Sequence, residues 1–374
     1  MIPMATDFHE SITLSARLVH VGEPITVRLT SRQEYVPLTL EVTARYLENP
    51  FAVGDGLRVT WDVTGAIKQG TAIFTPEEPG SYVIRFGEFH RSFAVVDETY
   101  AVCLLTIPFA TSRYPKGNQL DLYHPDVHSR HLPVNYTVMI TDRRSLDPEW
   151  AVHKTLRAFQ LIYDDAVVPF IDDLAATEAW QDAADGAAEN YWEVLFRRWT
   201  ALGYSSPDVV GVHAPDGTFI SEVRRRNLLG LVGLNAGPLG DGARQGSANP
   251  LVAEGDLFTV QRHTDRPSSD AVLSIPWLGG DDGANGLCPR LYLSDGRATT
   301  RDPSAFYADL DNAIADRRLF TVVLDGDAFD VVELNRTIIN RLLDLPQQHK
   351  LVFSRAQDAL RYVRRRAASE CKDA

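Results

Sequence analysis

The chain has 374 residues, of which 44% are hydrophobic and 23% are charged, so it is a folded protein with room for more than one domain. Its 37 Lys and Arg against 50 Asp and Glu give a formal net charge of −13, which repels phosphate backbones and anionic lipid surfaces. This charge argues against a nucleic-acid partner.

The chain begins without the basic and apolar regions of a signal peptide, and it holds no apolar run of the ~20 residues that a membrane span needs. Its cysteines, Cys103, Cys288 and Cys371, lack the paired spacing of a zinc site or a disulfide framework. We therefore expect a cytoplasmic protein with no membrane contact. The sequence leaves the oligomeric state open, a homo-oligomer included.

From residue 11 to residue 96, hydrophobic and polar residues alternate, and turn residues divide the pattern into short segments. Strands are predicted at 12–18, 25–29, 38–46, 57–63, 71–74, 81–86 and 92–96. The segment from Phe74 to Tyr82, Phe-Thr-Pro-Glu-Glu-Pro-Gly-Ser-Tyr, resembles a turn and strand of immunoglobulin-like accessory domains. We expect residues 1–97 to form a β-sandwich that braces its neighbour.

Near residue 98 the pattern changes, because apolar strands now alternate with amphipathic helices, which is typical of a parallel α/β sheet or barrel. Buried strands are predicted at 101–107, 136–140, 209–212, 229–234, 271–275, 320–324 and 351–353. Helices are predicted at 148–163, 189–202, 304–317, 332–343 and 357–366. The last of these places Arg364, Arg365 and Arg366 in its final turn, where positive charge complements the helix dipole.

Two stretches resemble the polysaccharide deacetylase family, carbohydrate esterase family 4. The first, from Trp192 to Gly237, contains the strand Val-Val-Gly-Val, the turn His-Ala-Pro-Asp-Gly and a second apolar strand; the other runs from Leu319 to Arg366. The resemblance implies a distorted (β/α)7-type barrel over residues 98–374, and so an α+β multidomain protein. It also implies hydrolysis of acetylated sugars through a divalent metal held by one Asp and two His. The family's Asp-Asp pair is missing, since the first barrel strand ends Leu-Thr-Ile-Pro-Phe.

Three histidines, His124, His128 and His131, lie within eight residues of one another after the first barrel strand. The spacing of His124 and His128 equals that of the metal-binding pair in the family. Neutral imidazole together with carboxylate suits zinc or a similar divalent ion. The alternative is that the histidines lie in a solvated surface loop and bind nothing, in which case no cofactor is expected.

Further polar residues follow predicted strands directly, where α/β barrels place their catalytic groups. The candidate catalytic residues are Asp142, His213, Asp216, Asp325 and Asp327. Ordinary roles compete with this interpretation, because Asp residues at such places also cap helices and form turns. The candidate substrate-binding residues are Arg143, Asn235 and Trp277.

These residues favour a carbohydrate-directed hydrolase whose metal-bound or carboxylate-activated water attacks a glycan or another small-molecule substrate. One alternative is a metal-independent glycosidase, lyase or isomerase that uses paired Asp residues as acid and base. The other is a non-catalytic carbohydrate-binding or assembly protein on a deacetylase-like fold that has lost its acid pair.

Overall fold

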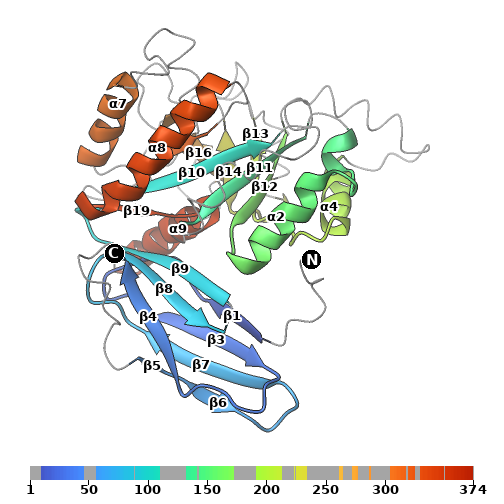
Figure 1. Ribbon diagram of the computed structural model, residues 1–374, viewed down its shortest axis with the longest axis vertical. Helices are drawn as coiled ribbons and strands as arrows, with labels where there is room; N and C mark the ends of the chain where they lie inside the picture. The colour runs from blue at the N-terminus through green and yellow to red at the C-terminus, as the bar shows by residue number, and fades with distance from the viewer. Residues whose placement is uncertain are drawn as a thin grey trace.

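The computed structural model describes residues 10–45, 56–87, 89–109, 132–140, 143–171, 191–212, 223, 225–233, 261–263, 272–276, 286–287, 304–316, 319–324, 329–348 and 350–373. These residues form a mixed α/β structure with three sheets, in which strands β1 to β9 lie at one end and the parallel strands at the other (Figure 1). No helix in the described part of the chain is long and apolar enough to cross a membrane.

Two small sheets fold from the N-terminal part of the described chain. The first has the order β1-β3-β7-β6 and is antiparallel, with β1 (Glu10–Leu14), β3 (Ile25–Ser31), β7 (Lys68–Phe74) and β6 (Thr60–Asp62). The second has the order β2-β9-β8-β4-β5, with β2 (Leu18–His20), β9 (Phe89–Val96), β8 (Gly80–Phe86), β4 (Thr39–Arg45) and β5 (Leu57–Arg58). Only its β2–β9 pair is parallel.

Both small sheets contribute side chains to one hydrophobic core, which includes Ile12, Val27 and Phe74 from the first sheet and Val42, Tyr82 and Phe93 from the second. The alternation of polar and apolar residues explains this packing, since it gives each strand one buried face. Segments 12–18 and 57–63, each predicted as one strand, are divided between the two sheets in the structure. The chain therefore crosses from sheet to sheet where one uninterrupted strand was expected.

The third sheet is parallel except for one edge strand and has the order β15-β16-β14-β13-β12-β11-β10-β18-β17, with β19 also paired to β10. Its strands are β10 (Ala101–Phe109), β11 (Val134–Ile140), β12 (Ala166–Ile171), β13 (Val209–Val212), β14 (Gly230–Gly233), β15 (Gln261–His263), β16 (Val272–Pro276), β17 (Gly286–Leu287), β18 (Leu319–Val323) and β19 (Leu351–Phe353). Successive strands from β10 to β14 are neighbours, and β18 returns to the other edge of β10.

Strand β12 lies in the middle of this sheet but was not predicted. Its sequence, Ala-Val-Val-Pro-Phe-Ile, contains Pro169, which cannot donate a hydrogen bond and which argues against a central strand. The structure accommodates the proline because the pairing of β12 with β13 starts only at Phe170, opposite Gly211. Gly211 is needed there, since a Cβ atom would lie 2.1 Å from Cδ2 of Phe170.

The two faces of the parallel sheet are covered differently. One face packs against α2 (Ala151–Ile162), α4 (Tyr191–Ala201), α7 (Ser304–Ala315) and α8 (Phe329–Gln348) (Figure 1). The opposite face, which we call the α9 face, packs against α9 (Ala356–Asp373) and against Leu18 of β2. On β10, Val102 and Leu104 belong to the α9 face, whereas Cys103 and Leu105 belong to the other, as strand alternation requires.

Helix α9 extends seven residues beyond its predicted end, so the prediction that the arginine triplet lies in the last turn is wrong. Arg364 instead donates to the carbonyl oxygens of Leu228 and Leu229, at 3.3 and 2.7 Å. Arg365 pairs with Glu23 at 2.8 Å and donates to the carbonyl of Leu18 at 2.6 Å. These side chains attach the helix to the parallel sheet and to the N-terminal part of the chain.

Strands β19 and β11 lie end to end along one edge of β10. Cys103 of β10 pairs with Phe353 of β19, and two residues later Leu105 pairs with Val134 of β11. The side chain of Asn135 closes the junction: its amide donates to the carbonyls of Leu105 and Ser354, both at 3.2 Å, and its oxygen accepts from the Ala356 backbone N–H at 2.7 Å. It thereby also satisfies an amide in the first turn of α9.

The predicted division at residues 97 and 98 falls between the end of β9 at Val96 and the start of β10 at Ala101. The division into two independent domains stays a prediction. Leu18, Ala94 and Val96 of the small sheets share a hydrophobic cluster with Val102 of β10 and with α9.

Candidate functional site

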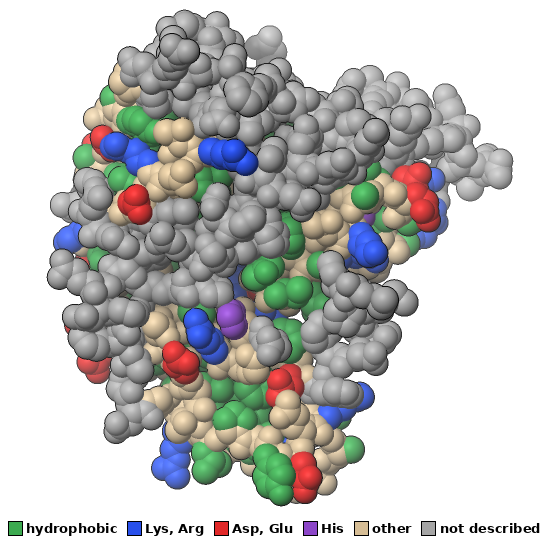
Figure 2. Space-filling view, viewed as in Figure 1, with side chains coloured by type: hydrophobic (Ala, Val, Ile, Leu, Met, Phe, Trp, Pro, Cys, Tyr) green, Lys and Arg blue, Asp and Glu red, His purple; other side chains and the backbone are tan. Residues whose placement is uncertain are grey.

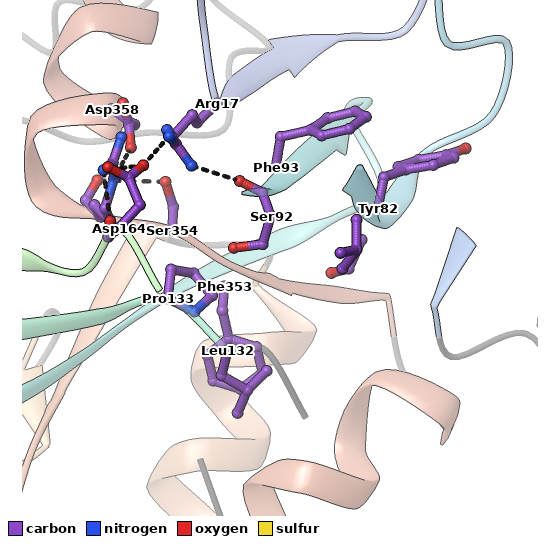
Figure 3. A pocket seen from close by; sticks show the side chains of 13 residues that line it. Arg17, Tyr82, Ser92, Phe93, Leu132, Pro133, Asp164, Phe353, Ser354 and Asp358 are labelled. Atoms are coloured by element: carbon purple, nitrogen blue, oxygen red, sulfur yellow. Dashed lines mark hydrogen bonds and ion pairs between the residues drawn. The ribbon is translucent and has the colours of Figure 1, made fainter. Parts of the chain in front are cut away.

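A pocket opens where β8 and β9 meet the amino ends of β11 and β12 and the carboxyl end of β19 (Figure 3). Tyr82, Phe93 and Phe353 form part of its apolar wall, and Arg17, Asp164 and Arg355 form part of its polar wall. The rings of Tyr82 and Phe93 stack with their centroids 5.2 Å apart. The pocket volume is about 20 Å³, which is room for little more than a water molecule.

The charged groups of this pocket pair with one another. The carboxylate of Asp164 binds both Arg17 and Arg355, and Arg355 also binds Asp358 (Figure 3). Arg17 donates in addition to the carbonyl of Ser92 on β9 at 3.3 Å. Burial, reinforced by the nearby charge of Arg355, lowers the pKa of the Arg17 guanidinium well below its usual range. The network therefore links the N-terminal sheets, the end of α2 and the start of α9.

The position of the pocket sets it apart from the predicted catalytic site. Pro133 directly precedes β11 and Asp164 lies two residues before β12, whereas Phe353 is the last residue of β19, so the pocket lies where the amino ends of β11 and β12 meet the carboxyl end of β19. Parallel α/β sheets and barrels bind their substrates where their strands end, which for β11 and β12 is the end away from the pocket. We interpret the pocket as a structural junction.

Most predicted site residues lie outside the described residues: His124, His128, His131, Asp142, His213, Asp216, Asn235, Trp277, Asp325 and Asp327. Of Arg143 the structure gives the backbone alone, at the first residue of the 3-10 turn η2 (Arg143–Leu146) that follows β11. The structure thus leaves the mutual geometry of these side chains untested.

What the structure does give is the strand that precedes each candidate. In sequence, Asp142 comes two residues after β11, His213 one after β13, Asn235 two after β14, Trp277 one after β16 and Asp325 two after β18. These strands are parallel members of one sheet, so their carboxyl ends lie at the same edge. Five of the predicted residues therefore follow one edge of one sheet.

The segment 124–131, which holds His124, His128 and His131, does not follow its strand as closely as these five residues do. It follows the carboxyl end of β10, but its last histidine, His131, directly precedes Leu132, which lines the pocket at the amino end of β11. Among the described residues, no three His, Cys, Asp or Glu side chains lie close enough to hold a metal ion. The predicted ligands lie outside that search.

A buried histidine that sequence reasoning overlooked lies beside the turn after β11. His153 of α2 is 1% exposed; its Nε2 donates to the carbonyl of Ser145 in η2, and its Nδ1 accepts from the hydroxyl of Tyr204, both at 2.9 Å. Burial lowers the pKa of His153 to about 4, so the ring is neutral at pH 7. It stabilises the turn that begins at Arg143.

Sequence reasoning also overlooked polar residues inside the strands. Thr106, Asn135 and Thr137 are at most 3% exposed, although their strands were interpreted as continuous apolar runs. A signal was present, since Val-Asn-Tyr-Thr-Val in β11 alternates polar with apolar residues, and alternation marks two different faces.

The exposed large hydrophobic residues of the described chain all belong to its N-terminal part: Tyr35, Leu38, Val63, Ile67 and Ile73. Figure 2 shows hydrophobic side chains at the surface of this end of the molecule, where Figure 1 places β6 and β7.

The sequence was also compared with known proteins. It matches no protein-family model and no curated protein sequence.

Proposed function

We propose that the chain is a carbohydrate-directed hydrolase whose site lies at the carboxyl edge of the parallel sheet. One observation carries the proposal: Asp142, His213, Asn235, Trp277 and Asp325 come one or two residues after five parallel strands of a single sheet. Catalytic groups contributed by several different strands are the general arrangement of α/β barrel enzymes. The amino ends of β11 and β12 are occupied by the junction with the N-terminal sheets.

The finer architecture belongs to the same proposal. Strands β10 to β14 and β16 are neighbours in the sheet, and β18 lies on the other side of β10, an order that supports the proposed distorted (β/α)7-type barrel. The two small sheets share one hydrophobic core, which supports the proposal that they form a β-sandwich. The resemblance to polysaccharide deacetylases, based on residues 192–237 and 319–366, supports the choice of an acetylated glycan as substrate.

The candidate residues fit this chemistry by their functional groups. Asp142 would accept the proton of the attacking water, and Asp325 or Asp327, protonated at the start of the reaction, would donate its own proton to the leaving group. Arg143, Asn235 and Trp277 would hold the glycan by hydrogen bonds and stacking. His124, His128 and His131 would supply the imidazole donors that suit zinc, and His213 and Asp216 would serve as further catalytic groups. A bound divalent ion would supply polarisation of the acyl carbonyl.

The test is hydrolysis of acetylated glycans by the purified full chain. We expect release of acetate from N-acetylglucosamine oligomers or acetylated xylan, and a loss of about 100-fold or more in kcat/KM for Asp142→Ala and for His128→Ala. Asp344→Asn, at an exposed position of α8, is the matched control and should keep full activity. Elemental analysis of the same preparations tests the metal, which His128→Ala should lose.

The outcomes separate the alternatives. Cleavage of glycosidic bonds in a metal-free preparation, abolished by Asp142→Asn or Asp325→Asn, would replace the proposal by acid and base catalysis with paired carboxylates. Glycan binding without turnover after prolonged incubation would indicate the non-catalytic carbohydrate-binding protein.

A further inference from the structure

Two neighbouring segments of the first small sheet carry four exposed hydrophobic side chains, which we call the apolar tip: Tyr35, Leu38, Val63 and Ile67. Segment 32–38 follows β3, and segment 63–67 connects β6 to β7. Ser31, the last residue of β3, pairs with Lys68, the first residue of β7, so both segments leave the sheet at the same end. Figure 1 places β6 and β7 at the end of the molecule away from the parallel strands, so the apolar tip lies apart from the proposed catalytic edge.

The backbone on both sides of Tyr35 is held in place, although it belongs to no helix or strand. On one side, the amine of Lys68 donates to the carbonyl of Gln33 at 2.7 Å. On the other side, the indole N–H of Trp61 donates to the carbonyl of Pro37 at 2.7 Å. Tyr35 is nevertheless 82% exposed. The chain thus presents a large aromatic ring to solvent on an ordered backbone, and a ligand that covers the ring does not have to order a loose loop.

The extent of the apolar tip indicates the size of its ligand. Its four side chains are 82, 73, 58 and 45% exposed, and together they present a surface on the order of 300–600 Å², the size of patch that is often functional on a monomer. A specific protein interface takes about 800 Å² from each partner. The apolar tip is therefore too small for a stable contact with a second copy of the chain, and it suits a few sugar rings.

The surroundings of the apolar tip suit an uncharged ligand that is rich in hydroxyl groups. The exposed residues Gln33, Asp62 and Thr64 bring hydrogen-bond donors and acceptors to its border. Arg32 and Glu34, which are also exposed, carry opposite charges, so the tip has no field of a single sign that would attract a polyanion or a polycation. A neutral glycan matches both properties.

We infer that the apolar tip is a glycan-binding surface that retains the polymeric substrate, with Tyr35 stacked on a sugar ring. One face of a pyranose ring is lined by C–H groups, which pack on the electron-rich face of an aromatic ring. Leu38 and Val63 add apolar surface that suits the methyl groups of acetyl substituents. The inference rests on the proposed function and adds a second binding surface, separate from the residues proposed to act on the acyl group.

The experiment removes the ring by Tyr35→Ala and measures co-sedimentation of the full chain with insoluble chitin, the polymer of N-acetylglucosamine. The affinity for chitin should be about tenfold weaker than that of the unsubstituted chain, with the melting temperature unchanged, because the side chain is exposed. Tyr35→Phe, which keeps the ring, should keep the affinity. The matched control is Ile73→Ala: Ile73 is 64% exposed on the same sheet, but it pairs with Thr26 near the other end of β3.

The outcomes separate this inference from the proposed function. If Tyr35→Ala binds chitin as tightly as the unsubstituted chain, which still hydrolyses the soluble N-acetylglucosamine tetramer, the inference is overturned and the proposed function stands. Chitin binding that depends on Tyr35, without hydrolysis of the tetramer, would support the inference and refute the hydrolase.

Three further results would overturn the inference. The first is that Ile73→Ala weakens chitin binding as much as Tyr35→Ala does, because the binding is then not specific to the apolar tip. The second is that sedimentation velocity shows a dimer that Tyr35→Ala dissociates, because a second copy then covers the tip. The third is that the unsubstituted chain neither binds nor hydrolyses acetylated glycans, in which case the proposed function fails as well.

Discussion

His153 is a residue whose burial has a measurable pH consequence. Its ring is enclosed by Trp150 and Tyr204, at centroid distances of 5.2 and 5.6 Å, and both ring nitrogens have hydrogen-bond partners. A second proton would have to reside on Nδ1, which accepts from the Tyr204 hydroxyl. The folded state therefore favours the neutral ring, and burial lowers the pKa to about 4 against 6.5 for an ordinary histidine.

We predict that the free energy of unfolding falls in acid because His153 takes up a proton only in the unfolded state. Above pH 6.5 the ring is neutral in both the folded and the unfolded state, so it adds no pH dependence. Between pH 6.5 and about 4 only the unfolded state takes up the proton, and the free energy of unfolding should fall by ~1.4 kcal/mol per pH unit. Urea unfolding at several pH values measures this slope.

His153→Gln provides the comparison, because its amide can donate to Ser145 and accept from Tyr204 without titrating. Between pH 6.5 and about 4, the free energy of unfolding of the variant should therefore fall less steeply with acid, by the ~1.4 kcal/mol per pH unit that His153 contributes. An identical pH dependence in both proteins would mean that His153 is not the responsible group.

At the scale of elements, Asn135 of β11 binds β10 and also the turn between β19 and α9, where Ser354 lies 219 residues away in the sequence. Its side chain makes three hydrogen bonds while 3% exposed, so its removal leaves three buried backbone groups without their protein partner. The junction of β11 with β19 depends on this one amide.

Asn135→Ala should therefore lower the free energy of unfolding by about 3 kcal/mol, because the Ala356 amide and two carbonyls lose a buried partner. Denaturant unfolding checks the value. Asn340→Ala, at an exposed position of α8, should stay within about 0.5 kcal/mol of the unsubstituted chain. An equally small change for Asn135→Ala would show that water or a shifted backbone takes its place.

The elements show what a sequence pattern can predict. The segments 209–212 and 351–353 form strands as predicted, and α2, α4, α7, α8 and α9 overlap the five predicted helices, because each has an apolar periodicity. Pro169 concealed β12, and the division of 12–18 between two sheets depends on distant partners. Periodicity carries no information on pairing, so the junction at Asn135 and the arginine contacts of α9 were beyond prediction. The candidate site remains a sequence-based hypothesis whose strands alone are described.

At the scale of the whole molecule, the N-terminal sheets are bound to the parallel sheet by buried cations. Arg91 of β9 is 7% exposed and donates to the carbonyl of Ile12 at 3.0 Å and to the carbonyls of Leu161 and Ile162, at 3.4 and 3.1 Å, at the end of α2. Burial lowers the pKa of Arg91 to about 10, which still leaves it charged at pH 7. Arg17 and Arg365 add further links.

These links predict that the described parts unfold together. Calorimetry should show one unfolding transition. Arg91→Ala should lower the free energy of unfolding by about 2–3 kcal/mol, because it removes charge-assisted hydrogen bonds to the N-terminal sheets and to the end of α2, and the transition should remain single. Arg85→Ala, at an exposed position of β8, is the control and should leave the transition in place. Two separate transitions in the unsubstituted chain would contradict this expectation.

The pairing of β10 has a consequence for how the chain folds as it is synthesised. Its residues 101–109 pair on one edge with residues 319–323 and on the other with residues 351–353 as well as with β11. Such distant contacts slow folding, because a long loop must close before the pairing is gained. On the ribosome, the first four residues of β10 have no strand partner until about 217 further residues have emerged, the separation of Cys103 from Phe320 of β18, and the partner on their other edge, β19, follows later still. This apolar segment, Ala-Val-Cys-Leu, is therefore one that a chaperone would have to shield during synthesis.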